Sequence, residues 1–420
     1  MKFNLKEILR DEMQKKTIII NPGVLTESYV PDYLLFRDEE VAQITRHLGR
    51  YLSGIQPGNL LIHGPPGTGK THAIKIVAKS YNEFVNETGI NSKIIYINCK
   101  DKTYYQTLVA LLHGLGVEFP ERGLGVSEAV EALTLYLKES NGRHVFVFDE
   151  IDKLKRTYRD KEEPMNALIY RMSRLDELLD KEGPLIIMIS NKSNIIEKIE
   201  HATRAKFTPQ TIYFREYNIE ELYQILLDRA ERALAPGSFT TEAIAYLADL
   251  VKKNERDLRW GFRVLIEAAL RAHDKLTTEL IDEAVNVVDN DMLSQVVHSL
   301  SNHQLIVLWA VAFLENVKIL PVTGELYHVY KLVCEEVGLK PRSMRHVMHY
   351  ITPKIESMGL ITSREKGQGR GRGKTLVFHL EENPEKILKL VESVLSERMH
   401  KEFKPEEIPE FIQISFQRRR

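Results

Sequence analysis

The sequence predicts an α/β protein: a doubly wound parallel sheet, then a small helical domain, and last a winged-helix domain. The first observation is that short β-branched or aromatic runs alternate with helical patterns as far as Phe214. This alternation is typical of a parallel sheet with helices on both faces. The second is that only helical patterns follow, to about residue 290. The third is a C-terminal series of three helical patterns and two short strand-like runs.

Five apolar runs have the composition of strands that are buried on both faces. They cover residues 60–63, 93–98, 144–148, 185–190 and 211–214. Helices are predicted between and after them, at 44–52, 71–81, 104–114, 127–139, 163–179, 219–234, 240–252, 260–276 and 278–288. The pattern weakens around residues 289–301, which predicts a domain boundary there.

The last third predicts helices at 304–316, 324–337 and 343–358, then strands at 360–363 and 375–380. Pro353 should kink or shorten the third helix, because proline lacks the backbone donor that the helix needs. Trp309 and Phe313 lie at helical spacing and are interpreted as core residues.

Composition excludes several classes of protein. The 420 residues carry a net charge of −1, so the chain is not coated in positive charge. Cys99 and Cys334 are the only cysteines and have no metal-type spacing, which indicates two reduced thiols. The N-terminus has no apolar stretch of a signal peptide, and no run approaches the roughly 18 residues of a membrane span. A cytoplasmic protein without membrane contact is expected.

Residues 64–71 fit the phosphate-loop pattern G-x-x-x-x-G-K-[ST], between a strand and a helix. Its glycines let backbone N–H groups point at a triphosphate. The predicted nucleotide-binding residues here are Gly64, Pro65, Pro66, Gly67, Thr68, Gly69, Lys70 and Thr71. Lys70 should reach the β- and γ-phosphates, and the Thr71 hydroxyl should bind Mg²⁺. His72 follows and is expected to approach a phosphate or the base.

An acidic pair ends the apolar run of residues 145–148. Asp149 is predicted to hold Mg²⁺ through its water shell, and Glu150 to orient and deprotonate the attacking water. The alternative is an ordinary acidic strand end. Asp152 is interpreted as a solvated helix cap.

Two further residues are candidates for sensing the γ-phosphate. Asn191 ends a predicted strand, where doubly wound sheets place their ligands; a simple turn former explains it equally well. Arg259 begins a helix, where a cation opposes the helix dipole and favours an anion nearby. A surface ion pair with Asp257 or Glu255 is the alternative.

The segment 340–374 holds nine Lys or Arg residues and two acidic ones. A helix-turn-helix places the start of its recognition helix in the major groove, which selects Arg342, Ser343 and Arg345. The Gly/Arg-rich turn that follows is predicted to be a cationic wing, suited to a narrow minor groove through Arg370, Arg372 and Lys374. The alternative is a solvated basic loop.

These residues together resemble the AAA+ superfamily with its RecA-like sheet, and more narrowly the archaeal replication initiators. That family is related to the largest subunit of the eukaryotic origin recognition complex and to the helicase-loading cell-division-cycle protein. The resemblance runs from about Tyr29 to Leu380 and includes the phosphate loop and the acidic motif. Ser190-Asn191 matches the first sensor and Asp257-Leu258-Arg259 the second.

The resemblance implies further site residues. The segment with Val30, Pro31 and Arg37 looks like the opening of the adenine pocket. Tyr217 and Arg229 would approach the nucleotide where the core joins the lid. Residues 103–124 resemble the initiator-specific helical insertion, which implicates Arg122 and Gly123 in DNA contact. After the first sensor the family pattern is altered, and Arg204 is the candidate for an arginine finger acting on a neighbouring subunit.

The predicted layout is an arm (1–28), an AAA+ core (29–216), a helical lid (217–295), a winged helix (300–382) and a C-terminal helix or tail (383–420). The main hypothesis is a cytoplasmic, nucleoid-associated initiator that binds ATP or ADP with Mg²⁺, hydrolyses ATP slowly as a switch, and binds double-stranded origin DNA. Paralogous initiators and the replicative helicase are implied as further partners. The alternatives are a STAND-like signalling ATPase whose winged helix contacts proteins, and a metabolic P-loop enzyme.

Overall fold

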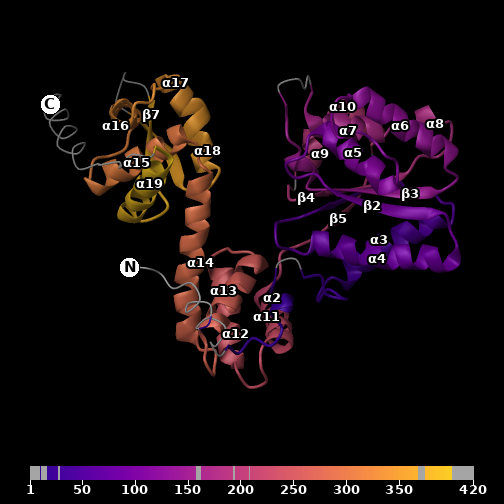
Figure 1. Ribbon diagram of the computed structural model, residues 1–420, viewed down its shortest axis with the longest axis horizontal. Coiled ribbons are helices and arrows are strands. Elements are labelled where there is room, and N and C mark those ends of the chain that lie inside the picture. Colours follow the sequence, from indigo (N-terminus) through magenta and orange to yellow (C-terminus); the bar gives the residue numbers. More distant parts are fainter. Residues whose placement is uncertain are drawn as a thin grey trace. The chain divides into compact units, whose positions relative to one another are not determined.

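The computed structural model describes residues 10, 17–26, 29–157, 162–192, 194–207, 209–367 and 374–399. The chain divides into two compact units after Val285 (Figure 1). The first unit holds the sheet and the lid helices, and the second holds the winged helix. Within the described residues, no helix is long and apolar enough to cross a membrane.

The first unit is built on a five-stranded sheet in the order β2-β3-β4-β1-β5. All four neighbouring pairs are parallel, as the alternation of strands and helices predicted. The strands are β1 (Leu60–His63), β2 (Ser92–Asn98), β3 (Arg143–Asp149), β4 (Leu185–Ser190) and β5 (Gln210–Tyr213).

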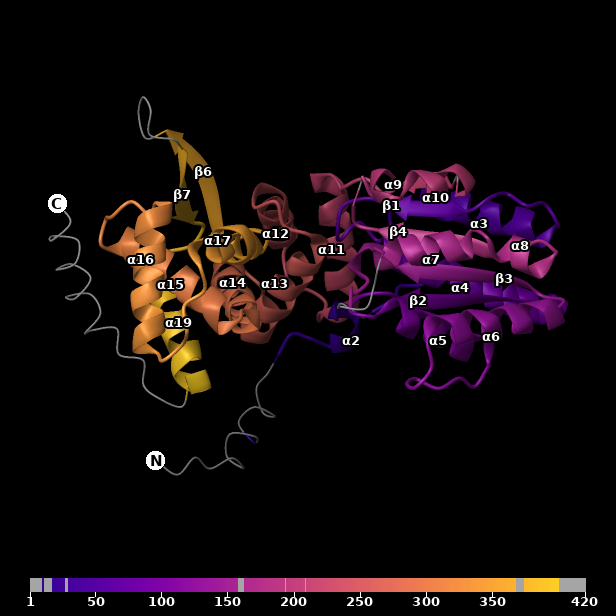
Figure 2. The ribbon, with the colours of Figure 1, turned by 90° about the horizontal axis from the view of Figure 1, so that it is seen from above.

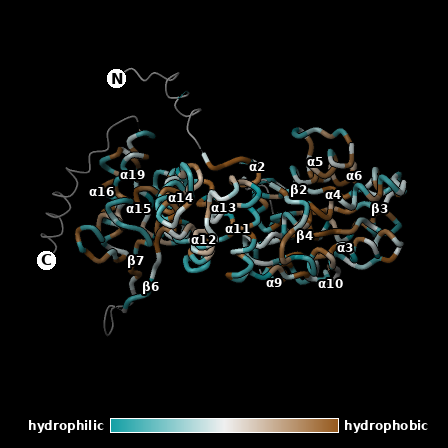
Figure 3. The backbone as a smooth tube through the Cα atoms, turned by 90° about the horizontal axis from the view of Figure 1, so that it is seen from below, coloured by the Kyte–Doolittle hydropathy of each residue, from teal (hydrophilic) through white to brown (hydrophobic). Residues whose placement is uncertain are grey.

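Helices cover both faces of this sheet (Figure 1). On one face, strand residues such as Val145 and Ile187 share a core with α3 (Asp38–Leu52) and α4 (Lys70–Thr88). Their neighbours Phe146 and Met188 point to the other face. That face is covered by α5 (Tyr104–Leu115), α6 (Val126–Glu139), α7 (Pro164–Met172) and α8 (Leu175–Leu179). Burial on both sides explains why the central strands β1, β3 and β4 are largely hydrophobic, as the tube through β4 shows (Figure 3). The edge strand β5 is exposed at three of its four residues, so the prediction that it is buried on both faces was wrong.

Several helices differ from their predicted limits, including α3, which begins at Asp38 instead of residue 44, and α13 (Leu258–Arg271), which ends before residue 276. The helix after the phosphate loop continues to Thr88 and ends at Gly89, whose φ of 68° suits a left-handed cap. The segment 163–179 forms two helices, α7 and α8, instead of one. The helix predicted to end at residue 288 is α14 (Thr278–Ser299); its apolar spacing resumes with the buried Leu293 and Val297.

The lid consists of α11 (Ile219–Ala233), α12 (Thr241–Lys253), α13 (Leu258–Arg271) and the beginning of α14. Side chains cap three of these helices: Asn218 accepts from the amide of Glu221, Thr240 from that of Ala243, and Asp257 from that of Trp260. The short helix α2 (Pro22–Leu25) packs on α11 and α13. Within the sheet domain, the remaining short elements are η1 (Ile151–Lys153), α9 (Ile195–Lys198) and α10 (His201–Lys206).

The second unit has the predicted winged-helix elements (Figure 2). Its helices are α15 (Asn302–Asn316), α16 (Thr323–Glu336) and a third helical segment made of α17 (Met344–His346), the π-helical turn η2 (Val347–Ile351) and α18 (Thr352–Glu356). The strands β6 (Ile361–Gly367) and β7 (Lys374–Leu380) pair antiparallel, and α19 (Pro384–Met399) follows.

Two details of this unit follow from its sequence. The π-helical turn comes directly before Pro353, which stands in the first turn of α18, where its missing N–H costs least. Trp309 and Phe313 stack in the core at 5.2 Å between ring centroids, as predicted.

Candidate nucleotide site and nucleic-acid interface

The loop between β1 and α4 has a backbone that only glycine tolerates at key points. Gly64, Gly67 and Gly69 have φ values of 149°, 73° and 92°. A Cβ at Gly64 would lie 2.1 Å from the carbonyl oxygen of Phe214, and one at Gly67 would lie 2.6 Å from the Cβ of Asp257. The first contact involves the segment after β5 and the second involves the lid. The glycines therefore permit close packing as well as the turn itself.

Lys70 begins α4 and is 5 % exposed. Its Nζ donates to the carbonyl oxygens of Gly64 at 2.8 Å and Pro65 at 2.6 Å. Burial lowers the pKa of this ammonium to about 8, against a weaker opposing effect of Asp149. A buried cation whose neighbours are mainly neutral carbonyls is well suited to attract an anion.

The carboxylate of Asp149 is held by three donors at the end of β3. The Thr71 hydroxyl donates to Oδ2 at 2.7 Å, and the Tyr96 hydroxyl donates to the same oxygen at 2.6 Å. The backbone N–H of Glu150 donates to Oδ1 at 2.8 Å. Glu150 itself has a φ of 52°, an uncommon conformation for a residue with a side chain. Tyr96 was missed by the sequence analysis, although its place on β2 opposite Val147 follows from the strand register.

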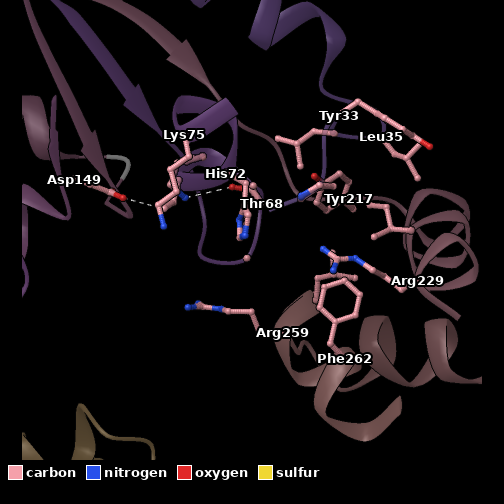
Figure 4. Close-up of a pocket in the computed structure, with 18 of the residues that line it drawn as sticks. Tyr33, Leu35, Thr68, His72, Lys75, Asp149, Tyr217, Arg229, Arg259 and Phe262 are labelled. Atoms are coloured by element: carbon pink, nitrogen blue, oxygen red, sulfur yellow. Dashed lines mark hydrogen bonds between the residues drawn. The ribbon is translucent and has the colours of Figure 1, made fainter. Parts of the chain in front are cut away.

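Side chains from the sheet and the lid line one pocket within the first unit, and Figure 4 shows Arg229, Arg259 and Phe262 reaching into it from the lid helices. The predicted residues that line it are Pro31, Gly67, Thr68, Gly69, Lys70, Thr71, His72, Asp149, Glu150, Asn191, Tyr217, Arg229 and Arg259. Residues that are far apart in the sequence, from Pro31 to Arg259, thus meet in one pocket at the carboxyl ends of the strands, where doubly wound sheets place ligands.

Several predicted residues lie outside the pocket lining. Arg37 is fully buried: its Nε donates to the carbonyl oxygen of Thr68 at 3.0 Å, and its guanidinium lies 3.9 Å from the ring centroid of Tyr217. This arginine supports the loop and an aromatic side chain. Val30 is 39 % exposed. The loop residues Gly64, Pro65 and Pro66 are also outside the lining. The carbonyl oxygens of Gly64 and Pro65 accept hydrogen bonds from Lys70 and so help to position its ammonium group.

The two lid arginines are held differently. Arg229 donates to the carbonyl of Val24, and its guanidinium lies 4.4 Å and 4.7 Å from the ring centroids of Tyr29 and Phe262. Burial lowers its pKa. Arg259 forms an ion pair with Asp257, the alternative that the sequence left open: Nη2 lies 2.8 Å from Oδ2, and the arginine side chain is 52 % exposed. It nevertheless lines the pocket.

Helical spacing could have revealed other lining residues. Lys75 lies four residues after Thr71 on α4, and Phe262 three residues after Arg259 on α13, so each shares a face with a predicted residue. Burial, with a contribution from Lys75, lowers the pKa of His72 below its ordinary value, which favours the neutral ring.

Two predictions concern residues beyond the pocket. Asp152, expected to be a solvated cap, has a side chain only 3 % exposed; that prediction was wrong, because the end of β4 covers it. Arg204 lies on α10, where its guanidinium donates to the carbonyls of Glu197 and Ile199 at 2.9 Å and 3.0 Å. Its role on a neighbouring subunit stays a prediction.

A magnesium ion fits the residues present. Thr71 Oγ1 and the carboxylate of Asp149 are hard oxygen donors that already lie within hydrogen-bond distance of each other. Mg²⁺ prefers one or two protein oxygens together with phosphates and water. When bound, it would neutralise phosphate charge at this point.

Of the predicted DNA-contacting residues, Arg122, Gly123, Arg342, Ser343 and Arg345 have a described exposure, and all five are exposed. Arg122 and Gly123 are exposed between α5 and α6, where Gly123 has a φ of 95°. Ser343 caps α17 by accepting from the amide of His346 at 3.3 Å. Arg342 and Arg345 are exposed on either side of that cap.

Two tyrosines of α16 fix the start of this helical segment. The Tyr327 hydroxyl donates to the carbonyl of Arg342 at 3.0 Å, and the amide of Arg342 donates to the Tyr330 hydroxyl at 3.0 Å. Lys374 begins β7. Arg370 and Arg372, predicted for the wing, lie outside the described residues.

Comparison with known proteins agrees with this architecture. Three family models match: the ATPase family associated with various cellular activities at residues 60–215, the Cdc6 AAA+ ATPase-type lid domain at 223–290, and the CDC6 C-terminal winged helix domain at 295–390. The chain is similar to an ORC1-type DNA replication protein of Desulfurococcus amylolyticus, with 30 % identity over 87 % of the chain and 92 % of that protein.

Further relatives extend the similarity. An ORC1-type DNA replication protein 1 of Sulfurisphaera tokodaii is 30 % identical over 92 % of the chain and 96 % of its own length. The solved structure of the Aeropyrum pernix ORC1 protein in complex with DNA matches with a TM-score of 0.80 and 29 % identity, covering 90 % of the chain and 97 % of that protein. The chain therefore belongs to the family of ORC1-type DNA replication proteins, with an AAA+ core, a Cdc6-type lid and a C-terminal winged helix.

Proposed function

We propose that this protein is an ATP-dependent initiator of DNA replication that binds double-stranded origin DNA. The observation that carries the proposal is the presence, in one chain, of a complete phosphate-loop pocket and a winged helix whose third helical segment begins with exposed arginines. Family membership supports it, since the relatives are named as DNA replication proteins and one was solved with DNA.

The pocket residues suit ATP hydrolysis. Lys70 would bind the β- and γ-phosphates, and Thr71 with Asp149 would hold Mg²⁺. Glu150 would orient the attacking water and accept its proton, while Asn191 and Arg259 would stabilise charge on the γ-phosphate. Arg259 is paired with Asp257, so nucleotide binding would compete with an existing ion pair. Arg204 would act on the site of a neighbouring subunit. We propose a nucleotide switch rather than a fast enzyme.

The DNA contacts would come from two elements. Arg342, Ser343 and Arg345 would enter the major groove, with Arg370, Arg372 and Lys374 of the wing at the minor groove. Arg122 and Gly123 of the insertion between α5 and α6 would make the second contact. Paralogous initiators and the replicative helicase are the partners that we propose beyond DNA, with the protein acting at the nucleoid.

The test is a binding titration of the full-length protein on origin fragments of its own genome and on random duplex of equal length, at physiological salt. We expect tighter binding to origin fragments, since base contacts add to phosphate contacts that every duplex offers. Equal affinity for both duplexes would contradict origin recognition. No measurable affinity for either would favour the signalling ATPase, whose winged helix contacts proteins.

A further inference from the structure

Asp152 is a buried carboxylate outside the set of residues assigned to the nucleotide. It lies two residues after Glu150, within the turn η1. Its Oδ1 accepts a hydrogen bond from the Ser190 hydroxyl at 2.9 Å, and Lys192 Nζ lies 3.5 Å from Oδ2. Ser190 is the last residue of β4, and Lys192 lies two residues beyond it. The carboxylate thus connects two segments that are 38 residues apart in sequence.

The partners of Asp152 lie on either side of Asn191. The backbone N–H of Lys192 donates to the Ser190 hydroxyl at 3.0 Å, which closes residues 190–192 into a turn. The Ser190 hydroxyl therefore accepts from this amide and donates to Asp152. Asn191 and Glu150 both line the nucleotide pocket. Asp152 therefore links the turn of residues 190–192, which carries Asn191, to η1, which directly follows Glu150.

Because the carboxylate of Asp152 is buried, it depends on its partners Ser190 and Lys192. A carboxylate that is 3 % exposed is costly unless charges or donors compensate it. Oδ2 is buried and accepts no hydrogen bond among the described residues, so the Lys192 ammonium is its compensation. Moving the end of β4 away from η1 would leave a buried charge without a partner. The separation of the two turns is therefore strongly fixed.

We propose that Asp152 is a positioning residue for ATP hydrolysis, which holds Asn191 at a set separation from Glu150. The inference rests on the proposed ATPase function. Nucleotide binding depends on Lys70 and Thr71, which belong to a different segment and form no hydrogen bond or ion pair with Asp152 among the described residues. The charge of Asp152 raises the pKa of Lys70, but less than Asp149 does. Loss of Asp152 should consequently slow the hydrolytic step and leave nucleotide affinity almost unchanged, since small misplacements of reacting groups reduce kcat strongly.

The first experiment measures kcat and the dissociation constant of ATP for the full-length protein. For Asp152→Ala we expect kcat to fall about tenfold or more, with the dissociation constant changed less than about twofold. Asp152→Asn keeps an acceptor for Ser190 and should recover part of the rate. In the double variant Asp152→Ala, Ser190→Ala, kcat should fall no further than in Asp152→Ala alone, because both changes break the same link. Glu139→Ala removes one exposed acidic side chain on α6 and is the control.

The idea is overturned if kcat of Asp152→Ala stays within twofold of the wild type, or if affinity falls in parallel with kcat. A second measurement needs no nucleotide: hydrogen exchange of residues 190–192 should accelerate in Asp152→Ala, while the phosphate loop keeps its protection. Unchanged exchange would also refute the link. If the wild-type protein neither binds nor hydrolyses ATP, the proposed function fails, and the exchange comparison still decides on Asp152.

Discussion

The nucleotide pocket and the proposed DNA face handle charge in opposite ways. In the pocket, Lys70 and Asp149 are buried and each contacts several partners at fixed distances. On the winged helix, the side chains of Arg342 and Arg345 are exposed. The backbone of Arg342 is fixed by hydrogen bonds to the hydroxyls of Tyr327 and Tyr330. A small ligand needs preorganised groups in a closed site, whereas a duplex needs cations that reach outward.

The strongest test of this comparison removes the buried cation. Lys70→Ala should weaken ATP binding by roughly 100-fold, since hydrogen bonds to charged groups are lost at two phosphates. Binding of labelled nucleotide measures it. Lys79→Ala, an exposed lysine on the same helix, is the control. DNA affinity without nucleotide should stay the same in both variants; a parallel loss would show that the two regions are not independent.

The complementary test removes exposed cations. Arg342→Ala combined with Arg345→Ala should lower DNA affinity roughly tenfold or more and leave nucleotide affinity unchanged. If both contact phosphates, the slope of log K against log salt should fall by about 2. Lys331→Ala with Lys389→Ala removes two exposed lysines from the same unit. An equal loss in this control would mean that the unit binds DNA only through its overall charge.

The same contrast explains which parts of the molecule could be predicted from the sequence. The central strands were predictable because burial on both faces requires continuous apolar runs, and the phosphate loop because Gly64 and Gly67 have no substitute there. Asp152 and Tyr96 were not, since their roles depend on partners 38 and 53 residues away. The continuation of α14 past residue 288 depends on packing in the second unit, which local periodicity does not reveal.

A smaller effect is expected at Tyr96, which separates preorganisation from direct contact. Tyr96→Phe removes one of the three donors to Asp149 and keeps the ring. The Mg²⁺-dependent part of ATP affinity should fall by roughly three- to tenfold, the range of one typical hydrogen bond, because two donors still orient the carboxylate. Binding is measured with Mg²⁺ and with a chelator. Tyr246→Phe, which removes a hydroxyl from an exposed carboxylate contact on the lid, is the control. Equal changes in both conditions would place Tyr96 outside the metal site.

The smallest effect is expected at Glu392, a partly buried carboxyl group of the second unit. Glu392 accepts a hydrogen bond from Trp309 Nε1 at 2.9 Å, and burial raises the pKa of its carboxyl above the ordinary value. The folded state therefore holds this proton more tightly than the unfolded state. As pH falls from the raised pKa toward the ordinary one, this group should add stability to the unit.

Glu392→Gln lacks that titration and keeps an acceptor for Trp309, so it isolates the contribution. The fluorescence of Trp309, recorded in a Trp260→Phe background because the chain has two tryptophans, follows unfolding of the second unit. The Tm of the wild type, measured relative to that of Glu392→Gln, should increase as the pH is lowered from 7 to 5. A difference that stays constant with pH would mean that the carboxyl of Glu392 is solvated in the folded state.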